Sequence, residues 1–533
     1  MRVALGQINT TVGDLTGNTA RMVDFAKRAA ERDAELIVFP ELSITGYPPR
    51  DLVEKPSFLI DSEVALDRLA AQTAHLPIAI VAGFVARSAG ETGNRATNCA
   101  ALLERGQVLF RQAKVLLPNY DVFDEARYFV SAEQQVPFCY RSRNLAIAIC
   151  EDAWNDKRFW AHRRYGRDPV EELIAKGGDY LININSSPYW TGKRQIRRDM
   201  VAAQARRHQV PVVWVNQVGG NDQLVFDGSS FAMDAEGNVV ASARSFAEDL
   251  VIFEQHADYA DECEAVYQAL VLGTRDYVRK CGFAKALIGL SGGIDSSLVA
   301  CIAVDALGAE NVTGISMPGP YSSAGSITDA QALADNLGIT MIAAPITNAY
   351  RCMSATLPQS PVTQENIQSR LRGVTMMAYS NDTGAMVLTT GNKSEIAVGY
   401  CTLYGDMCGG LSVISDVPKT MVYALSRLRE GIIPESVFEK PPSAELRPEQ
   451  KDTDSLPDYD TLDAILRENV EHYRTPAEIC AQLHLPVALA EDIAAKVDRN
   501  EYKRQQAAPG LKVTTKAFGI GRRFPIAQRY RSS

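Results

Sequence analysis

The sequence lacks the features that would assign the chain to a membrane or to export. No run of 18 apolar residues occurs, so no transmembrane helix is predicted. The first residues, MRVALGQ, are typical of a strand and lack the basic start, long apolar stretch and small-residue cleavage site of a signal peptide. We therefore expect a cytoplasmic protein with no membrane partner.

The cysteines and histidines lack the spacing of redox or zinc sites. None of the ten cysteines forms a Cys-x-x-Cys pair, and none of the six histidines lies three to five residues from another. In a reducing compartment, most of these cysteines are expected to be small buried side chains. A zinc site is not predicted.

An excess of positive charge is also missing. Lysine and arginine number 55 against 64 aspartates and glutamates, which gives a net charge of −9. Nucleic acid is therefore disfavoured as the main partner, because neutralising its phosphates needs a cationic surface. Any cationic binding surface for small anions must be local.

The composition is that of a globular protein of several domains. Hydrophobic residues make up 46% and charged residues 22% of 533 residues, which excludes disordered and fibrous classes. At about 150 residues per domain, the length predicts two to four domains. No internal repeat is present.

The first half alternates short apolar runs with helical patterns, which predicts a layered α/β domain. Helices are expected at 19–32 and 169–176, and a hairpin at 98–111. Strands are expected at 3–8, 36–39, 78–84, 145–150, 180–184 and 212–215.

The second half begins after an acidic stretch, EQHADYADECE, with no apolar period. We predict one domain over 1–254, a linker over 255–264 and a second domain over 265–533. A helix is expected at 265–281, and the later strands, at 286–290, 312–316, 340–344 and 386–389, alternate with helical segments. This rhythm predicts a doubly wound parallel sheet. The tract 440–460 is rich in proline and charge, and long loops of this kind are lids or mobile surface segments.

Three strand-like runs of the first half end in side chains that suit acyl transfer. Glu41, Lys114 and Cys150 each follow such a run, and layered α/β folds place chemistry at strand ends. A cysteine is nucleophilic only as a thiolate, so it needs a base and a nearby cation. Glu41 suits the base, and Lys114 suits the group that stabilises the oxyanion together with a backbone N–H. Taken singly, each residue is more often structural.

The flanks make the combination specific. The segments FPELSITGYPP, KVLLPNYDVFDE and ICEDAW resemble those of the nitrilase, or carbon–nitrogen hydrolase, superfamily over roughly residues 1–250. The resemblance implies an α-β-β-α sandwich, a catalytic Glu41–Lys114–Cys150 triad, and Glu125 as a residue that orients the lysine. The glutaminase branch implies glutamine contacts at Tyr120, Ser187 and Lys193, the last two in NSSPYWTGK. A structural salt bridge at Glu125 and a surface position for Lys193 remain alternatives.

The segment IGLSGGIDSS opens the second domain between a strand and a helix. Its glycines let the backbone approach an anion, and its N–H groups and the helix N-terminus favour phosphate. It contains no Gly-Lys-Ser/Thr, so it is not a Walker A loop. Asp295 suits magnesium, because hard cations prefer carboxylate oxygen.

This loop resembles the SGGxDS motif of the N-type ATP pyrophosphatases, which transfer AMP to a substrate oxygen before a nitrogen nucleophile displaces it. The resemblance implies a Rossmann-like domain of the adenine nucleotide alpha hydrolase type. It also implies a set of ATP contacts in one continuous segment: Gly289, Leu290, Ser291, Gly292, Gly293, Ile294, Asp295 and Ser296.

Downstream segments are similar to the NAD synthetases within this group. They are MPGPYSSAGSITDA, ENIQSRLRG, LTTGNKSEIAVGYCTLYGDMCGG, KPPSAELRPEQKDTDSLPDYDTL and KVTTKAFG. The resemblance implies an ATP contact at Thr390 and a magnesium site shared by Asp295 and Glu395. It implies deamido-NAD contacts at Asn366, Glu395 and Lys516. One of Arg370 and Arg372 would face the phosphates, and Asp406 and Lys419 are lesser candidates.

Together, the two resemblances imply a glutamine-dependent member of the NAD synthetase family. Its substrates would be ATP, deamido-NAD and glutamine, with Mg²⁺ as cofactor, and ammonia would pass between the sites through a protected tunnel. The family also implies a homo-oligomer. The 440–460 tract then fits a lid that keeps water from the adenylate.

Two other functions remain open at this point. One is the amidation of a different carboxylate or carbonyl, such as one on a nucleotide base; the segments ENIQSRLRG and KPPSAELRPEQKDTDSLP argue against it. A metabolite-binding scaffold with an inactive amidase half is the other alternative. Retention of Glu41, Lys114 and Cys150 argues against that alternative.

Overall fold

The computed structural model describes residues 1–88, 90, 93–253 and 255–530. The chain divides into two compact units, Met1–Asp261 and Glu262–Ser533. The predicted boundary residue 254 lies outside the described residues. Helix α6 (Glu262–Lys280) begins inside the acidic stretch expected to be linker. Its first turn holds Glu262 and Glu264, because carboxylates are favourable at the positive end of a helix.

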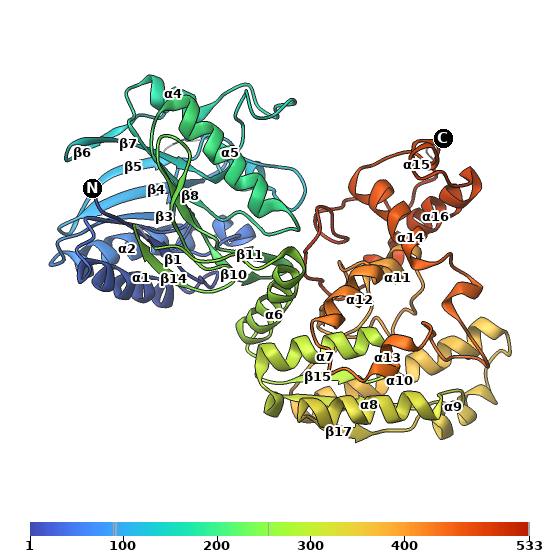
Figure 1. The fold of residues 1–533 in the computed structure, drawn as a ribbon. Helices are drawn as coiled ribbons and strands as arrows, with labels where there is room; N and C mark the ends of the chain where they lie inside the picture. Colours follow the sequence, from blue (N-terminus) through green and yellow to red (C-terminus); the bar gives the residue numbers. More distant parts are fainter. Residues whose placement is uncertain (89, 91–92, 254, 531–533) are drawn as a thin grey trace. The chain divides into compact units, whose positions relative to one another are not determined.

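The first unit contains two six-stranded sheets, each with two helices on its outer face (Figure 1). One has the order β14-β1-β2-β3-β4-β5 and the other β13-β12-β9-β8-β7-β6. The first sheet comprises β1 (Val3–Gln7), β2 (Leu36–Val38), β3 (Ala79–Arg87), β4 (Ala96–Glu104), β5 (Gln107–Ala113) and β14 (Asp249–Ile252). The second comprises β6 (Phe138–Tyr140), β7 (Arg143–Ile149), β8 (Tyr180–Asn185), β9 (Val212–Asn216), β12 (Phe231–Met233) and β13 (Val239–Ser242).

Apolar side chains fill three layers of this unit. Leu5 and Val38 of one sheet pack with Ile147 and Ile182 of the other. Helices α1 (Leu15–Ala30) and α2 (Pro56–Thr73) cover the first sheet. Helices α4 (Pro169–Ala175) and α5 (Lys193–His208) cover the second. The predicted α-β-β-α sandwich is therefore confirmed.

Shorter elements complete the first unit. The hairpin of β10 and β11 is a separate two-stranded sheet. The short elements are η1 (Arg50–Glu54), α3 (Glu125–Tyr128), η2 (Cys150–Ala153), β10 (Val218–Asn221) and β11 (Leu224–Asp227).

The second unit is built on a parallel five-stranded sheet of order β17-β16-β15-β18-β19. The strands are β15 (Ala286–Gly289), β16 (Val312–Ser316), β17 (Thr340–Ala343), β18 (Met386–Thr389) and β19 (Leu411–Ser412). The order reverses direction at β15, which pairs with both β16 and β18. Ligands bind such sheets at the carboxyl ends of the strands flanking the reversal. The predicted doubly wound sheet is confirmed.

Helices surround this sheet (Figure 1). Leu287 of β15 packs against Met376 of α10 on one face. The helices besides α6 are α7 (Ile294–Leu307), α8 (Ala324–Leu337), α9 (Thr347–Ser354), α10 (Pro361–Thr383), α11 (Lys393–Val398), α12 (Lys419–Arg427), α13 (Glu435–Glu439), α14 (Tyr459–Leu466), α15 (Pro476–Leu483), α16 (Val487–Arg499) and α17 (Glu501–Arg504). Three single turns, η3 (Ala309–Asn311), η4 (Asp452–Asp454) and η5 (Arg467–Glu471), join them.

Helices α11, α14, α15 and α16 share a second apolar cluster. The 440–460 tract crosses from α13 to α14 and contains only η4 and the first residues of α14. In the part of the chain that the structure describes, no helix combines the length and the apolar character needed to span a membrane.

Candidate active sites

Cys150 lies at a sharp turn where β7 ends and η2 begins. Its φ of +44° is in the left-handed region, which is unfavourable for a residue with a Cβ. The backbone N–H of Cys150 donates to Oδ1 of Asn183 at 3.0 Å and is held there. Burial raises the pKa of the Cys150 thiol, as does the charge of Glu41, whereas Lys114 lowers it. The thiol therefore needs a base to become a nucleophile.

Lys114 brings two carboxylates together in the same place. Its Nζ lies 2.7 Å from Glu41 and 2.8 Å from Glu125, and all three side chains are buried. Burial lowers the pKa of Lys114, but Glu125 and Glu41 outweigh this and raise it well above its ordinary value. The lysine is therefore a fixed cation, and the structure brings the predicted Glu41, Lys114 and Glu125 into one cluster.

Each carboxylate has further partners that fix its orientation. Glu41 accepts hydrogen bonds from Nδ2 of Asn98 at 2.7 Å and from the backbone N–H of Ser186 at 2.9 Å. Glu125 accepts one from the Tyr47 hydroxyl at 2.8 Å. Burial raises the pKa of Glu125 to about 7, while Lys114 lowers it. The cluster can therefore hold or move a proton near neutral pH.

Tyr120 lies beside the residue that follows the cysteine. Its hydroxyl donates to the Glu151 carboxylate at 3.0 Å, and the guanidinium of Arg164 lies 3.8 Å from the centre of its ring. Burial and the Glu151 charge raise the pKa of Tyr120, so the hydroxyl is a donor at neutral pH. Glu151 is itself buried and was not among the residues predicted from the sequence.

Ser187, in the loop that follows β8, and Lys193, where that loop ends, are both buried. The backbone N–H of Ser187 donates to Asn216 Oδ1 at 2.9 Å. Lys193 is the first residue of α5, its Nζ donates to the Pro188 carbonyl at 2.8 Å, and it lies 5.3 Å from the centre of the Trp154 ring. The surface position considered for Lys193 is therefore wrong.

The glycine-rich loop of the second unit joins β15 to α7. The Ser291 and Ser296 hydroxyls lie 3.1 Å apart, and Ser291 also accepts from the Gly293 N–H at 3.2 Å. Gly292 has a φ of +74°, and a Cβ there would lie 2.1 Å from the Ser326 carbonyl. Only glycine fits this close approach. The loop leads into the N-terminus of α7, and the N-terminus of a helix favours an anion.

Asp295 and Glu395 both contact one buried lysine. Lys419 Nζ pairs with Asp295 and lies 3.9 Å from Glu395, and Asp295 also accepts from Asn392 Nδ2 at 2.9 Å. Burial, with the charge of Asp295, raises the pKa of Glu395 to about 8. The two carboxylates fit a magnesium ion, which takes one or two protein carboxylates together with phosphate oxygens. Among the described residues, no group of three or more metal-ligating side chains occurs.

Thr390 directly follows β18, the strand that pairs with β15. It therefore lies at the same sheet edge as the glycine-rich loop. Asn366 of α10 accepts a hydrogen bond from the Thr402 hydroxyl at 2.9 Å. Asp406 accepts from the Ser369 hydroxyl and the Thr402 N–H, so it fastens the 402–406 turn to α10.

The two candidate arginines occupy different places. Arg372 donates from Nε to the Met317 carbonyl at 3.1 Å, beyond the end of β16. Arg370 donates from Nε to the Leu403 carbonyl at 3.2 Å and is exposed. Burial lowers the pKa of Arg372. Arg372 is therefore the one whose contact lies at the carboxyl edge of the sheet.

The segment that carries Lys516 is held by two buried charged residues, Asp416 after β19 and Lys393 at the start of α11. Asp416 accepts from the backbone N–H groups of Val513 and Thr514 at 2.8 and 2.7 Å. Lys393, at the start of α11, donates to the Lys516 carbonyl at 3.0 Å and pairs with Asp416 at 3.1 Å. The Lys516 ammonium itself lies 5.9 Å from the centre of the Tyr473 ring.

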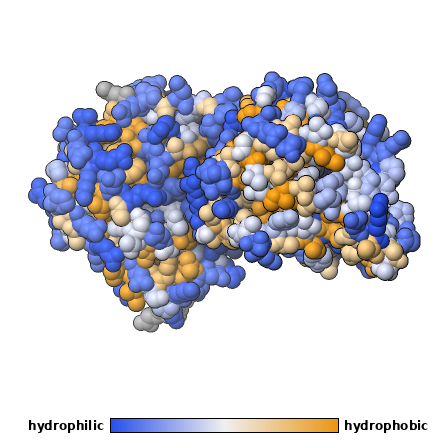
Figure 2. All heavy atoms as spheres, turned by 90° about the horizontal axis from the view of Figure 1, so that it is seen from below, coloured by the Kyte–Doolittle hydropathy of each residue, from blue (hydrophilic) through white to orange (hydrophobic). Residues whose placement is uncertain are grey.

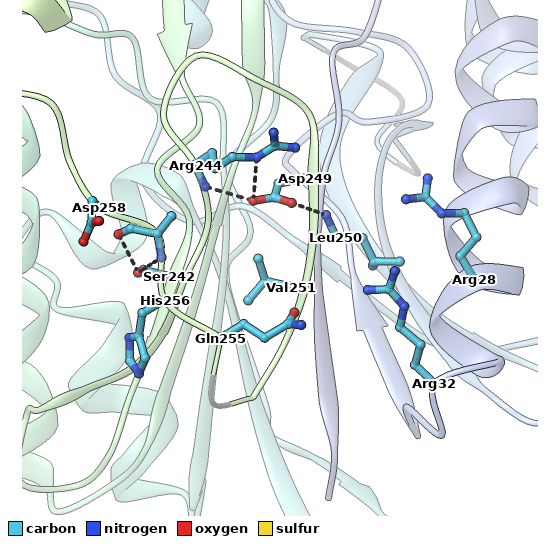
Figure 3. Close-up of a pocket in the computed structure, with 11 residues that line it drawn as sticks. Arg28, Arg32, Ser242, Arg244, Asp249, Leu250, Val251, Gln255, His256 and Asp258 are labelled. Carbon is cyan, nitrogen blue, oxygen red and sulfur yellow. Dashed lines mark hydrogen bonds and ion pairs between the residues drawn. The ribbon is translucent and has the colours of Figure 1, made fainter.

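An open groove of about 550 Å³ lies in the first unit, lined by residues at the end of α1 and in the segments 242–251 and 255–258. Figure 3 shows these side chains. Arg28, Arg32, Arg244 and His256 line the groove. Arg28 pairs with Asp24 and Arg244 with Asp249, so much of its positive charge is neutralised internally. None of the predicted site residues lines this groove.

Sequence reasoning missed the partners that orient the predicted groups. The signal was present for Glu151, which adjoins Cys150, and for Asn392, which lies in the segment TTGNKSEIA. Tyr47 lies in the quoted segment FPELSITGYPP, but its contact with Glu125 joins two distant parts of the chain. For Asn98 and Ser186 the sequence offered no signal, because each reaches Glu41 from a strand or loop far away in the chain.

Family models match both units. The carbon–nitrogen hydrolase model matches residues 2–264 and the NAD synthase model residues 266–507. A glutamine-dependent NAD(+) synthetase from Synechocystis sp. is 47% identical over 99% of both chains. One from Thermotoga maritima is 40% identical over 100% of this chain and 99% of its own.

Solved structures match along the whole chain as well. A glutamine-dependent NAD+ synthetase from Acinetobacter baumannii, in complex with adenosine diphosphate, is 40% identical with a TM-score of 0.76 over 98% of both chains. One from Cytophaga hutchinsonii is 22% identical with a TM-score of 0.84, and covers 99% of this chain and 98% of its own. The second match supports the fold alone.

Proposed function

Because the chain belongs to the glutamine-dependent NAD(+) synthetase family, we propose that it converts deamido-NAD, ATP and glutamine into NAD(+), AMP, pyrophosphate and glutamate. One observation carries the proposal. Each unit holds its own reactive cluster, Glu41–Lys114–Glu125 beside Cys150 in the first and Asp295–Lys419–Glu395 at the glycine-rich loop in the second.

The first unit supplies ammonia. Glu41 takes the thiol proton of Cys150, and the thiolate attacks the side-chain amide carbon of glutamine. Lys114 stabilises the oxyanion that forms, Glu41 returns the proton to the leaving ammonia, and a thioester remains. Glu41 then activates water, which releases glutamate and restores the thiol. The fixed charge of Lys114 between two carboxylates supports these roles.

Glutamine recognition falls to Tyr120, Ser187 and Lys193. An α-amino acid presents a carboxylate and an ammonium, which need donors and acceptors in a desolvated pocket. Tyr120, beside Glu151, and the buried Lys193 offer both kinds of group close to the cysteine. The free ammonia must stay unprotonated to act as a nucleophile, so we propose a protected passage from this site to the second.

The second unit activates the nicotinate carboxylate. That carboxylate attacks the α-phosphorus of ATP, pyrophosphate leaves, and ammonia then displaces AMP from the acyl adenylate. The N–H groups and hydroxyls of the segment 289–296 suit the phosphates, and Thr390 adjoins them at the sheet edge.

Mg²⁺ would be held by Asp295 and Glu395, whose convergence on Lys419 leaves carboxylate oxygens close together. When bound, the ion would offset the negative charge of the phosphates. Lys419 holds the two carboxylates in place and adds a positive charge of its own. In the sequence it ranked as a lesser candidate; its contacts support a larger role.

Deamido-NAD would contact Asn366, Glu395 and Lys516, with Arg372 facing its phosphates. The position of Arg372 beside Met317 supports it over Arg370. Asp406 fastens a turn to α10 and is better assigned to positioning. The anchoring of 513–516 by Asp416 and Lys393 supports a fixed place for Lys516.

The 440–460 tract is proposed as a lid. Lys440 donates to Asp329 at 2.7 Å and to the Gly292 carbonyl at 3.4 Å. Glu445 accepts from the N–H and hydroxyl of Ser323 at 3.1 and 2.9 Å. These contacts tie the tract to α8 and to the glycine-rich loop, where a lid would exclude water from the adenylate.

A cytoplasmic homo-oligomer is the proposed state of the enzyme. Val362, Val374 and Met377 of α10 are exposed apolar side chains, and Figure 2 shows apolar patches on the face of the second unit seen from below. Exposed apolar patches often mark protein–protein contacts. Analytical ultracentrifugation of the purified protein would give its state.

The test is a product assay. Purified protein with ATP, Mg²⁺, deamido-NAD and glutamine should form NAD(+), AMP and pyrophosphate in equal amounts, measured by chromatography. Omitting deamido-NAD should abolish AMP formation. Failure to form the amide of deamido-NAD would contradict the proposal and return attention to another carboxylate as acceptor.

A further inference from the structure

Asp152 is a buried carboxylate that takes no part in the chemistry above. It lies two residues after Cys150, in η2, and is 2% exposed. Oδ1 accepts from the backbone N–H of Leu116 at 2.7 Å and of Val115 at 3.1 Å. Oδ2 accepts from the backbone N–H of Ile149 at 3.2 Å. One carboxylate therefore joins the residues directly after Lys114 to the residue directly before Cys150.

The cysteine side of this bridge is strained. The φ of +44° at Cys150 costs on the order of 1–3 kcal/mol and persists only where the surroundings determine it. Two consecutive N–H groups are held by buried side chains, Ile149 by Asp152 and Cys150 by Asn183. The bridge thus fixes the backbone from which the thiol projects.

The lysine side is fixed in the same way. The Lys114 N–H donates to the Asn98 carbonyl at 2.8 Å, and the next two N–H groups donate to Asp152. Three consecutive N–H groups therefore set the point from which the Lys114 side chain reaches Glu41 and Glu125. A shift of this segment would move the ammonium away from the place where the oxyanion forms.

We propose that Asp152 is a positioning residue for amide hydrolysis, which sets the Lys114 ammonium against the Cys150 thiol through the backbone of both segments and without touching glutamine. The inference rests on the proposed glutaminase role of the first unit. In this proposal, the Asp152 carboxylate fixes the position of the Lys114 ammonium relative to the Cys150 thiol. The rate of hydrolysis depends steeply on that position.

The test compares Asp152→Asn with the wild type in the full chain. Asparagine keeps the shape but replaces one acceptor oxygen by an NH₂ donor, so at least one N–H loses its acceptor. We expect kcat for glutamine hydrolysis to fall about 100-fold, the order expected for a misplacement of about 1 Å. KM for glutamine should stay within about threefold, because Tyr120, Ser187 and Lys193 are untouched.

Asp156→Asn is the matched control. Asp156 is equally buried and accepts from the N–H groups of Arg158 and Phe159 at 2.8 and 3.0 Å. Its side chain contacts residues 158–159 and Arg207, which do not adjoin Lys114 or Cys150 in the chain. Asp156→Asn should therefore lower stability and leave kcat within about threefold. Equal losses of kcat in both variants would overturn the inference, since they would mark Asp152 as merely structural.

A second readout needs no substrate. Cys150 is alkylated with iodoacetamide at pH values from 6 to 10, and mass spectrometry of its peptide gives the extent of reaction. The pH dependence of this reaction reports the ionisation of the thiol. In Asp152→Asn the apparent pKa of alkylation should rise relative to the wild type, because Lys114 would no longer be held against the thiol. An unchanged alkylation profile together with an unchanged kcat would refute the positioning role.

Two further measurements keep the outcomes separate. NAD(+) formation from high ammonium should stay within about twofold in Asp152→Asn, because it depends on the second unit. A wild type that does not hydrolyse glutamine would contradict the proposed function, whereas the alkylation comparison would still test Asp152. Should Asp152→Asn not unfold cooperatively, Asp152→Glu keeps the buried acceptors but displaces them, and a lowered kcat at constant KM is expected there too.

Discussion

Lys114 has no exposed surface and still carries a charge, and its neighbours explain why. Removing an ion from water costs several kcal/mol unless opposite charges meet it. Glu41 and Glu125 meet it at 2.7 and 2.8 Å. Two buried carboxylates share one positive charge, so their mutual repulsion favours the protonated form of one of them. That carboxylate is Glu125, whose pKa burial raises to about 7.

Replacing Glu125 by glutamine should therefore change the pH dependence of glutamine hydrolysis. With a pKa of about 7, Glu125 passes from about one tenth to about nine tenths ionised between pH 6 and pH 8. Wild-type kcat/KM should rise over this interval as Lys114 becomes better held. The variant should lose that rise and be roughly 10- to 100-fold slower at pH 8, as when a partner of a catalytic group is removed.

The same substitution should alter stability with a definite sign. The folded-state pKa of Glu125 lies above its ordinary value of 4.5, so the folded protein binds a proton that the unfolded chain lacks between about pH 4.5 and 7. This stabilisation is present at low pH and lost as pH rises through 7. Relative to Glu125→Gln, the unfolding free energy of the wild type should therefore fall from pH 5 to pH 8. A constant difference in unfolding free energy would contradict the raised pKa.

The reactive residues could be predicted because their chemistry restricts the residue type. Glu41, Lys114 and Cys150 each follow an apolar run, and few residue types can act as base, oxyanion stabiliser and nucleophile. Asp152 and Asn98 could not be predicted in the same way. Asn98 donates to Glu41, and Asp152 accepts from backbone N–H groups that follow β5, a strand of the other sheet; these approaches are not visible along the chain.

At the scale of elements, the proposed lid is held by two charged side chains. Lys440 and Glu445 both reach the N-terminal turn of α8. Glu445 takes the position that favours a negative charge, at the positive end of the helix. If these contacts close the tract over the adenylate, loosening them should let water in before ammonia arrives.

Glu445→Gln should raise the ratio of AMP formed to NAD(+) formed above one. The neutral amide weakens the charge-assisted hydrogen bonds to Ser323 and Ser326. Glu449→Gln is the matched control on the same tract, because Glu449 is exposed and shares the positive φ of Glu445. The ratio should stay near one in the control, and a ratio near one in both variants would speak against the lid.

Helix α5 shows why one long element escaped the sequence analysis. Its sequence, KRQIRRDMVAAQARRH, is dominated by basic residues, which suggests a solvated segment. In the structure, Arg197 is fully buried and pairs with Asp227 through both guanidinium nitrogens at 3.0 Å. Hydrophobic periodicity cannot reveal a helix whose inner face is partly an ion pair. Strands with continuous apolar runs, such as β1, β3 and β8, were predicted to within a few residues, whereas the shorter strands β6, β10 to β14 and β19 were not predicted.

At the scale of the whole molecule, the chain consists of two units with separate cores. Substitution in one reactive cluster should therefore leave the chemistry of the other intact. Cys150→Ala should abolish NAD(+) formation from glutamine and retain most of the rate with high ammonium. The measurement is the initial rate of NAD(+) formation with each nitrogen source.

Cys99→Ala serves as the control for this experiment. Cys99 is also a buried cysteine of the first unit, on β4, and burial raises its pKa to about 11. It should keep activity with both nitrogen sources. Loss of the ammonium-supported reaction in Cys150→Ala would contradict the prediction for that variant. It would mean that the second unit needs an intact first unit for catalysis as well as for its ammonia.

The anchoring of residues 513–516 by Asp416 and Lys393 bears on the order in which the enzyme comes into being. Domains fold N-terminal first as a chain is synthesised, so the first unit can close while the second is still being made. In the second unit, residues 513–516 come after every helix and strand in the sequence. They bind Asp416, which follows β19, so this contact forms last. A nascent chain can thus acquire a finished glutamine site before it has a site able to consume ATP.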